Sequence, residues 1–248
     1  MDNVRVGLHS TKALNLDGHF NFREDVFLHD KNAKKKLLKF IEKNDEDICW
    51  ILGDSFMEFN LNYVRHYLNI YNKKAIFMSL GGSSVYYSYM RFLNIENDVK
   101  PYHTTLVGVS SANRHFFNHY HINGFNNINT ARKRKPTKRF MEAVQLYYEE
   151  LFDFDENYNT ISAVVDSFKR RVEDRTKYNV FIPTLTEYEA LDNEPSLYHT
   201  VMKEWYKSSD KGKRPPRTPN HWIDDKEFTK TFLKHYNSKF ENWNKGPV

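Results

Sequence analysis

The sequence predicts an α/β protein, a three-layer α/β/α sandwich in which a mostly parallel sheet lies between two layers of helices. Short apolar runs of about five residues recur along the 248-residue chain, and Ile48–Leu52 is the clearest of them. Such runs are typical of strands that are buried on both faces. Longer segments with apolar residues at helical spacing separate them, and this alternation indicates parallel strands connected by helices. With 40% hydrophobic residues, the chain can form a sizeable core.

Residues 1–45 are predicted to be an N-terminal extension of one domain that covers residues 1–248. Alternating apolar residues at Val4, Val6 and Leu8 indicate an early strand in this extension. A helix follows that Asp30 could cap. Its apolar face carries Ala33, Leu37, Phe40 and Ile41.

The rest of the chain alternates between the two kinds of element. Strands are predicted at Ile48–Leu52, Ala75–Met78, Thr105–Val109 and Tyr178–Ile182. Helices are predicted around the apolar positions Leu61 and Leu68, Tyr86 and Leu93, Phe140 and Leu151, Ile161 and Phe168, and Phe228 and Tyr236. The Asn-rich segment from His115 to Pro136 has no clear period and is predicted to be a loop. In sheets of this kind, sites form at the carboxyl ends of the strands.

Composition narrows the class of protein further. The chain has no run of the roughly 20 apolar residues that a membrane helix needs, and its N-terminus has no signal-peptide core. Cys49 is the single cysteine, so we expect no disulfides and a reducing, cytoplasmic location. The net charge of +5 is mild. The basic run Arg132–Arg139 attracts polyanions, but it is more simply an exposed loop and helix start, and a nucleic-acid partner is not expected.

The tripeptide Gly53-Asp54-Ser55 is the clearest chemical signal. It follows the apolar strand Ile48–Leu52 and precedes a helix with Met57 and Leu61 on one face. Ser55 would therefore lie at a strand-to-helix turn, near unpaired backbone N–H groups and the positive end of a helix dipole. Such a position can stabilise a developing oxyanion.

The groups needed by a serine esterase follow in later segments. Such an enzyme requires a nucleophile, a base and donors aimed at the oxyanion. Ser55 and His221 are the candidates for nucleophile and base. The N–H groups of Ser55 and Gly82 and the side-chain amide of Asn113 are the candidate donors, and Gly82 suits this role because it has no side chain in the way. No cofactor and no metal are expected.

These segments resemble the four blocks of the SGNH (GDSL-type) hydrolase family, which keep Ser, Gly, Asn and His in that order. The matching segments are Ile51–Phe56, Ser79–Ser84, Val107–Arg114 and Pro219–His221, the last being similar to SGNH-like proteins of bacteriophages. The resemblance spans about residues 47 to 240. It implies a flavodoxin-like fold and an acyl-enzyme mechanism. The implied substrate is a short acyl ester or an O-acetylated carbohydrate, and the implied location is the cytoplasm, including a host cytoplasm, or a virion.

Two positions depart from the family pattern. The third block usually reads Gly-x-Asn-Asp, and here Ser111 and Arg114 replace the first and last of these residues. The fourth block usually has an aspartate three residues before the histidine, where this chain has Thr218. Without that carboxylate, another acid, a main-chain carbonyl or a Ser-His dyad would have to serve. The nearby acids Asp210, Asp224 and Asp225 do not have the matching spacing.

Other interpretations remain open. The first alternative is a non-catalytic SGNH-fold structural or binding protein, which Thr218 favours, and the second is a nucleic-acid-binding protein that uses Arg132–Arg139. Singly, the site residues also have structural explanations: Ser55 as an N-cap, Gly82 as a turn glycine, Asn113 as a turn cap and His221 as a surface residue. The group His115, His119 and His121 approaches metal-ligand spacing but lacks a nearby carboxylate or cysteine, so no metal is expected there. The SGNH resemblance implies instead that this segment lines the substrate cleft.

Overall fold

The computed structural model describes residues 5–7, 20–21, 31–57, 62–117, 120–123, 127–130, 136–208 and 226–244. Five of its strands form one sheet in the order β2-β4-β3-β5-β9, and each neighbouring pair is parallel. Their bounds are β2 Phe20–Asn21, β3 Ile48–Leu52, β4 Lys74–Phe77, β5 Thr104–Val109 and β9 Tyr178–Pro183. The predicted α/β class and parallel sheet are therefore confirmed.

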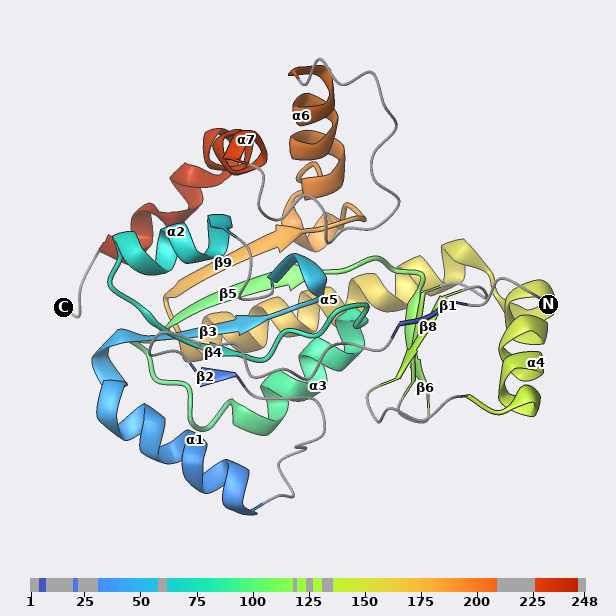
Figure 1. Cartoon of the computed structure of the whole chain (residues 1–248), viewed down its shortest axis with the longest axis horizontal. Coiled ribbons are helices and arrows are strands. Elements are labelled where there is room, and N and C mark those ends of the chain that lie inside the picture. The colour runs from blue at the N-terminus through green and yellow to red at the C-terminus, as the bar shows by residue number, and fades with distance from the viewer. Residues whose placement is uncertain are drawn as a thin grey trace.

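Helices cover both faces of this sheet, which is compatible with the predicted three layers (Figure 1). One face carries α1 (Lys31–Asn44), α3 (Val85–Ile95) and α5 (Phe154–Arg175), and the other carries α2 (Asn62–Ile70), α6 (Lys203–Ser208) and α7 (Lys226–Tyr236). The alternation of side chains along a strand explains the two cores. In β3, Trp50 packs with the first set of helices, whereas Cys49 and Ile51 pack with the second.

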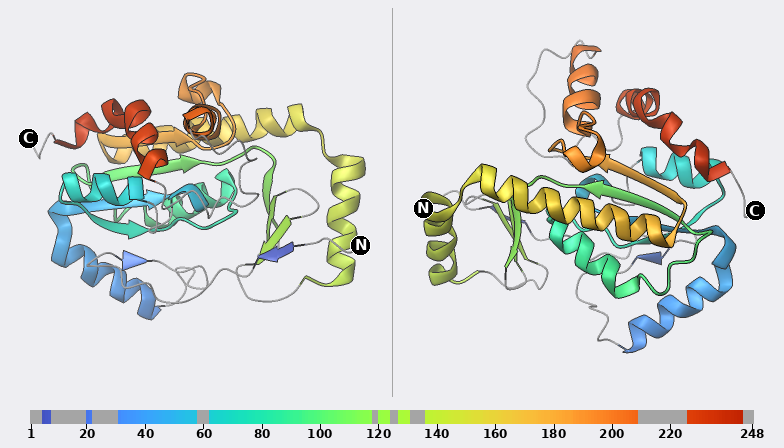
Figure 2. Two further views of the ribbon diagram at one scale, coloured as in Figure 1. Left: turned by 45° about the horizontal axis from the view of Figure 1, so that its top comes forward. Right: turned by 180° about the vertical axis from the view of Figure 1, so that it is seen from behind.

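A second sheet lies beyond the carboxyl ends of β3 and β5 (Figures 1 and 2). Its order is β1-β8-β7-β6, and the bounds are β1 Arg5–Gly7, β6 Arg114–Phe117, β7 Tyr120–Asn123 and β8 Asn127–Thr130. The pairs β6–β7 and β7–β8 are antiparallel, and β1–β8 is parallel. Helix α4 (Lys138–Leu146) packs against this sheet through Val144.

The second sheet corrects the prediction of a loop from His115 to Pro136. Its strands β6, β7 and β8 have only four residues each, which is too short for a period to stand out in the sequence. Tyr120 and Ile122 of β7 are nevertheless buried against Val144. Packing against α4 therefore selects strands that the sequence pattern alone does not indicate, since β-propensity depends strongly on context.

Residues of the predicted extension contribute to both sheets. β1 pairs with β8 and β2 pairs with β4, while Leu37 and Ile41 of α1 are buried in the core beside β3. The helix predicted around Phe140 and Leu151 is formed by α4 and by the π-helix Tyr147–Leu151 (η3) that continues it. A second π-helix, Tyr198–Met202 (η5), precedes α6 and was not predicted. A 3₁₀ segment, Asn237–Asn244 (η7), follows α7. Among the described residues, no helix combines the length and apolar character needed to cross a membrane.

Candidate active site

Three of the four predicted site residues lie at one edge of the main sheet. Ser55 begins the 3₁₀ turn Ser55–Met57 (η2) directly after β3, Gly82 lies in the turn between β4 and α3, and Asn113 lies in the turn after β5. Because β4, β3 and β5 are parallel neighbours, these three turns leave the sheet side by side. The strand order reverses at β3, and such switch points are where α/β sheets place their sites. His221 and Thr218 lie outside the described residues.

The first and second blocks are joined through the carbonyl of Gly53. The backbone N–H of Leu80 and the hydroxyl of Ser83 both donate to this oxygen, each at 2.9 Å. Two residues earlier in each segment, the Met78 N–H donates to the Ile51 oxygen at 2.7 Å. These bonds extend the β3–β4 contact beyond the strands and fix the Gly82 turn relative to Ser55.

Two glycines allow the first and third blocks to approach closely. Gly53 has a φ of +134°, a conformation that favours glycine. A Cβ atom there would lie 2.7 Å from the Gly108 oxygen. A Cβ atom on Gly108 would lie 2.4 Å from Cγ of Met57. The chain can therefore turn sharply at Ser55 only because both positions lack a side chain.

Asp54 is a fully buried carboxylate whose oxygens are held by three donors. The Phe56 N–H donates to Oδ1 at 3.0 Å, while Oδ2 accepts from the Arg114 guanidinium and, at 3.3 Å, from the Thr184 hydroxyl. Burial raises the pKa of Asp54, and Arg114 and the other two donors oppose that rise. Arg114 is itself buried and forms an ion pair with Asp54.

The contact between Asp54 and Arg114 gives a structural explanation for one departure from the family pattern. The sequence pattern marks Arg114 as an exception at the usual aspartate position but does not connect it with Asp54. A signal was present, because a carboxylate in an apolar strand-to-helix turn needs a partner and Arg114 is the cation in the third block. Thr184, which follows β9, carried no comparable signal.

Side chains from later parts of the chain hold the turn Ser110–Asn113. The Tyr188 hydroxyl donates to the Ser110 carbonyl at 2.7 Å, and the Asn157 amide donates to the Ala112 carbonyl. The Tyr148 hydroxyl donates to the Asn113 carbonyl at 3.1 Å. Tyr148 belongs to the π-helix η3, a rare structure often found at functional sites. The turn that carries Asn113 is thus tied to the region of the second sheet and to the segment after β9.

The candidate oxyanion donors have no internal partner within the described part of the chain. This holds for the backbone N–H groups of Ser55 and Gly82 and for the side-chain nitrogen of Asn113. The Ser55 hydroxyl, on a half-buried residue, likewise makes no hydrogen bond among these residues. The arrangement thus leaves a hydroxyl and three N–H donors available at the turns that end adjacent strands.

His199 is a histidine near the end of β9, but its contacts do not form a catalytic triad. Ser196 contacts its Nδ1 at 2.8 Å, and Glu187 lies 3.4 Å from the same nitrogen. A triad needs the hydroxyl and the carboxylate on different ring nitrogens. The Ser196 hydroxyl also accepts from the His199 N–H at 3.3 Å, which is the contact of a helix cap.

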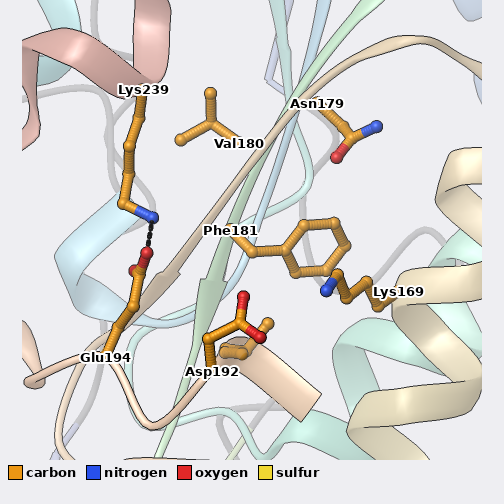
Figure 3. A pocket seen from close by; sticks show the side chains of 8 residues that line it. Lys169, Asn179, Val180, Phe181, Asp192, Glu194 and Lys239 are labelled. Carbon is orange, nitrogen blue, oxygen red and sulfur yellow. Dashed lines mark hydrogen bonds and ion pairs between the residues drawn. The ribbon is translucent and has the colours of Figure 1, made fainter.

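A cavity of about 200 Å³ lies along the outer side of the edge strand β9 (Figure 3). Asn179, Val180 and Phe181 of β9 line it together with Lys169 and Lys239. Its lysines are already engaged, Lys239 with Glu194 and Lys169 with the Ala190 carbonyl. None of the predicted site residues lines this cavity, and we assign it no chemistry.

No metal site is found among the residues that the structure describes, since no three potential ligands gather there. His115 is enclosed by the rings of Tyr147, Tyr148 and Phe152, and burial lowers its pKa. His119 and the side chain of His121 lie outside the described residues. Comparison with family models, curated proteins and solved structures gave no match to this chain.

Proposed function

We propose that this protein is a serine ester hydrolase of the SGNH type. Ser55 is the nucleophile and His221 the base that takes its proton. The Ser55 oxygen attacks the ester carbonyl carbon, and the resulting tetrahedral oxyanion collapses with release of the alcohol, which receives the proton from His221. Water then attacks the acyl-enzyme and releases the acid, restoring Ser55.

One observation carries this proposal: a free hydroxyl and three free N–H donors lie at neighbouring strand ends, in the described part of the chain. The donors are the backbone of Ser55 and Gly82 and the side chain of Asn113. Preorganised donors of this kind are usually the largest contribution to acyl-transfer catalysis. The three residues are half-buried rather than enclosed, so a substrate can reach these groups at the sheet edge.

The Asp54–Arg114 pair also supports this role. Asp54 directly precedes Ser55, so an uncompensated negative charge there would oppose a second negative charge on the oxyanion. Arg114 neutralises it from within the protein. The nucleophile can therefore lie next to an aspartate without an electrostatic penalty on the tetrahedral intermediate.

The resemblance to the SGNH blocks suggests the substrate class, which is a short acyl ester or an O-acetylated carbohydrate. p-Nitrophenyl acetate is a suitable first probe, because it needs no specific alcohol subsite. We expect the wild-type protein to hydrolyse it, Ser55→Ala and His221→Ala to abolish the activity, and Asn113→Ala to reduce kcat about 10²–10³-fold. Equal hydrolysis by wild type and Ser55→Ala would contradict the proposal.

A fluorophosphonate probe tests the nucleophile independently of the substrate. It phosphonylates an activated serine, and mass spectrometry of the digested protein identifies which one. We expect the label on the peptide that contains Ser55 and no label after heat denaturation. A label on another serine would assign the nucleophile elsewhere.

The alternative is a non-catalytic protein that keeps the fold for structure or binding. Thr218, in place of the family's aspartate, is the observation that favours it. A folded protein with neither hydrolysis nor fluorophosphonate labelling would support this alternative.

A further inference from the structure

Three hydrogen bonds connect the turn after β5 and the segment after β9 to the side chain of Asn113. The Ala112 N–H donates to the Thr186 hydroxyl at 3.4 Å, and Thr186 donates to the Ser111 hydroxyl at 3.2 Å. Ser111 donates in turn to Asn113 Oδ1 at 2.6 Å. Each hydroxyl in this chain both accepts and donates, so all its protons point in the same direction.

The direction of the chain determines how the Asn113 amide is oriented. Because the Thr186 proton is given to Ser111, the Ser111 proton is directed to an acceptor, and the amide oxygen is the group that accepts. The amide nitrogen then lies on the other side of the group, where it has no partner among the described residues. Without the chain, the amide could rotate and present its oxygen instead, which would repel an oxyanion.

We infer that Ser111 and Thr186 are positioning residues that fix the orientation of the Asn113 amide and so present its N–H group at the carboxyl edge of the sheet. The inference rests on the proposed function for its catalytic consequence, but the orientation itself can be measured separately. Ser111 occupies the position where the SGNH pattern has glycine. This departure from the pattern therefore supplies an interaction that glycine could not make.

The chain offers matched controls for a kinetic test. Ser110 is adjacent, is also buried, and its hydroxyl has no partner within the described residues, so Ser110→Ala removes the same atom without breaking a hydrogen bond. Thr186→Val removes the relay hydroxyl while keeping the shape of the side chain, and Thr186→Ser restores the hydroxyl.

With p-nitrophenyl acetate, we expect Ser111→Ala and Thr186→Val to lower kcat about tenfold, with KM little changed. The loss should be smaller than the 10²–10³-fold expected when a donor is removed altogether. Ser110→Ala and Thr186→Ser should retain wild-type kcat. Equal kcat in wild type and Ser111→Ala, or an equal loss in Ser110→Ala, would overturn the inference.

NMR tests the orientation without relying on activity. In protein labelled with ¹⁵N-asparagine, the side-chain resonances of Asn113 can be assigned by their disappearance in Asn113→Asp. We expect Ser111→Ala and Thr186→Val to shift or broaden these resonances, and Ser110→Ala to leave them unchanged.

The two measurements separate the two claims. Absent hydrolysis with Asn113 resonances that respond to Ser111→Ala would reject the esterase proposal and support the orienting role. Asn113 resonances that are identical in wild type and Ser111→Ala would reject the orienting role, whatever the activity.

Discussion

Asp54, the residue before the candidate nucleophile, forms a buried ion pair with Arg114. Both side chains are almost inaccessible to water, and their contact joins the turn after β3 to the start of β6. Removing two charges from water is costly, and their attraction offsets this cost only while both are present. The pair is therefore weak evidence for added stability but strong evidence that neither residue can be replaced alone.

Replacing one member of this pair should destabilise the protein strongly. We expect Arg114→Met to lower the free energy of unfolding by about 3–5 kcal/mol, because it leaves Asp54 buried without a counter-ion. The double variant Asp54→Asn/Arg114→Met should recover a large part of that loss. Urea denaturation measures each difference.

The exposed pair Arg170–Asp166 is a suitable control, with a nitrogen-to-oxygen distance of 2.8 Å. Its removal should change the free energy of unfolding by less than about 1 kcal/mol, as is usual for surface pairs. If the double variant lost as much free energy of unfolding as Asp54→Asn and Arg114→Met lose together when made singly, the two residues would not be coupled.

Gly108 and Met57 make a second residue-scale prediction. All three atoms nearest to a Cβ on Gly108 belong to the Met57 side chain. Gly108→Ala should therefore cost about 1–3 kcal/mol from overpacking, but much less in a Met57→Ala background, where the clash is absent. A double-mutant cycle by urea denaturation measures this coupling. Equal costs of Gly108→Ala in both backgrounds would show that Met57 is not the obstacle.

At the scale of elements, the beginning of α3 links the Gly82 turn to a helix. Ser84 has extended backbone angles and its hydroxyl accepts from the Tyr87 N–H at 3.2 Å, so it is the N-cap. Ser84→Ala should destabilise the protein by about 1 kcal/mol, and Ser84→Asp should largely restore the stability. Thermal denaturation measures both. At the neighbouring position, Ser83→Asp should not restore the stability that Ser83→Ala loses, because Ser83 donates to the Gly53 carbonyl and does not cap the helix.

The predictability of the elements depended on their length and burial. β3 and β5 were predicted because β3 is a continuous apolar run and β5 is rich in Val, Leu and Thr, and both are buried along their whole length. The strands β6, β7 and β8 were missed because what stabilises them is contact with one another and with α4. The helical segment formed by η5 and α6 was missed although a signal was present, since Leu197, Val201 and Trp205 recur every four residues and are buried in one core.

Only part of the candidate site could be predicted from the sequence. Ser55, Gly82 and Asn113 each follow a recognisable strand, so their common edge could be inferred from parallel pairing. The groups that hold them could not, because Thr184, Thr186 and Tyr148 reach the site from segments distant in sequence. Only the fold brings these hydroxyl groups to the site.

At the scale of the whole molecule, a polar cluster lies at the opposite end of the main sheet from Ser55. The buried His103, at the start of β5, accepts at Nδ1 from Trp50 Nε1 at 3.0 Å and from the Lys100 N–H at 3.1 Å. Its Nε2 contacts Asp45 at 3.2 Å, and Asp45 also accepts from Lys100 and Tyr102. Because Nδ1 accepts two bonds, the proton of the neutral ring lies on Nε2 and is donated to Asp45.

This cluster should make the fold sensitive to acid. Burial lowers the pKa of His103 below its ordinary value of 6.5, although Asp45 opposes this. Burial alone would raise the pKa of Asp45, but its hydrogen bonds with Lys100, Tyr102 and His103 lower it from 3.8 to about 2. In both cases the unfolded chain binds protons more readily than the folded one, so stability falls as the pH falls. The loss from His103 begins near pH 6.5, and that from Asp45 near pH 4.

We therefore expect the free energy of unfolding to decrease between pH 7.5 and pH 5, with His103 contributing at most about 1.4 kcal/mol per pH unit. His115, whose pKa is also lowered by burial, contributes with the same sign, whereas the raised pKa of Asp54 acts in the opposite sense. Urea denaturation at several pH values should show a shallower decrease in His103→Gln than in wild type, with His115→Gln as the comparison. Parallel pH profiles for wild type and His103→Gln would mean that His103 accepts its proton as readily in the folded protein as in the unfolded chain.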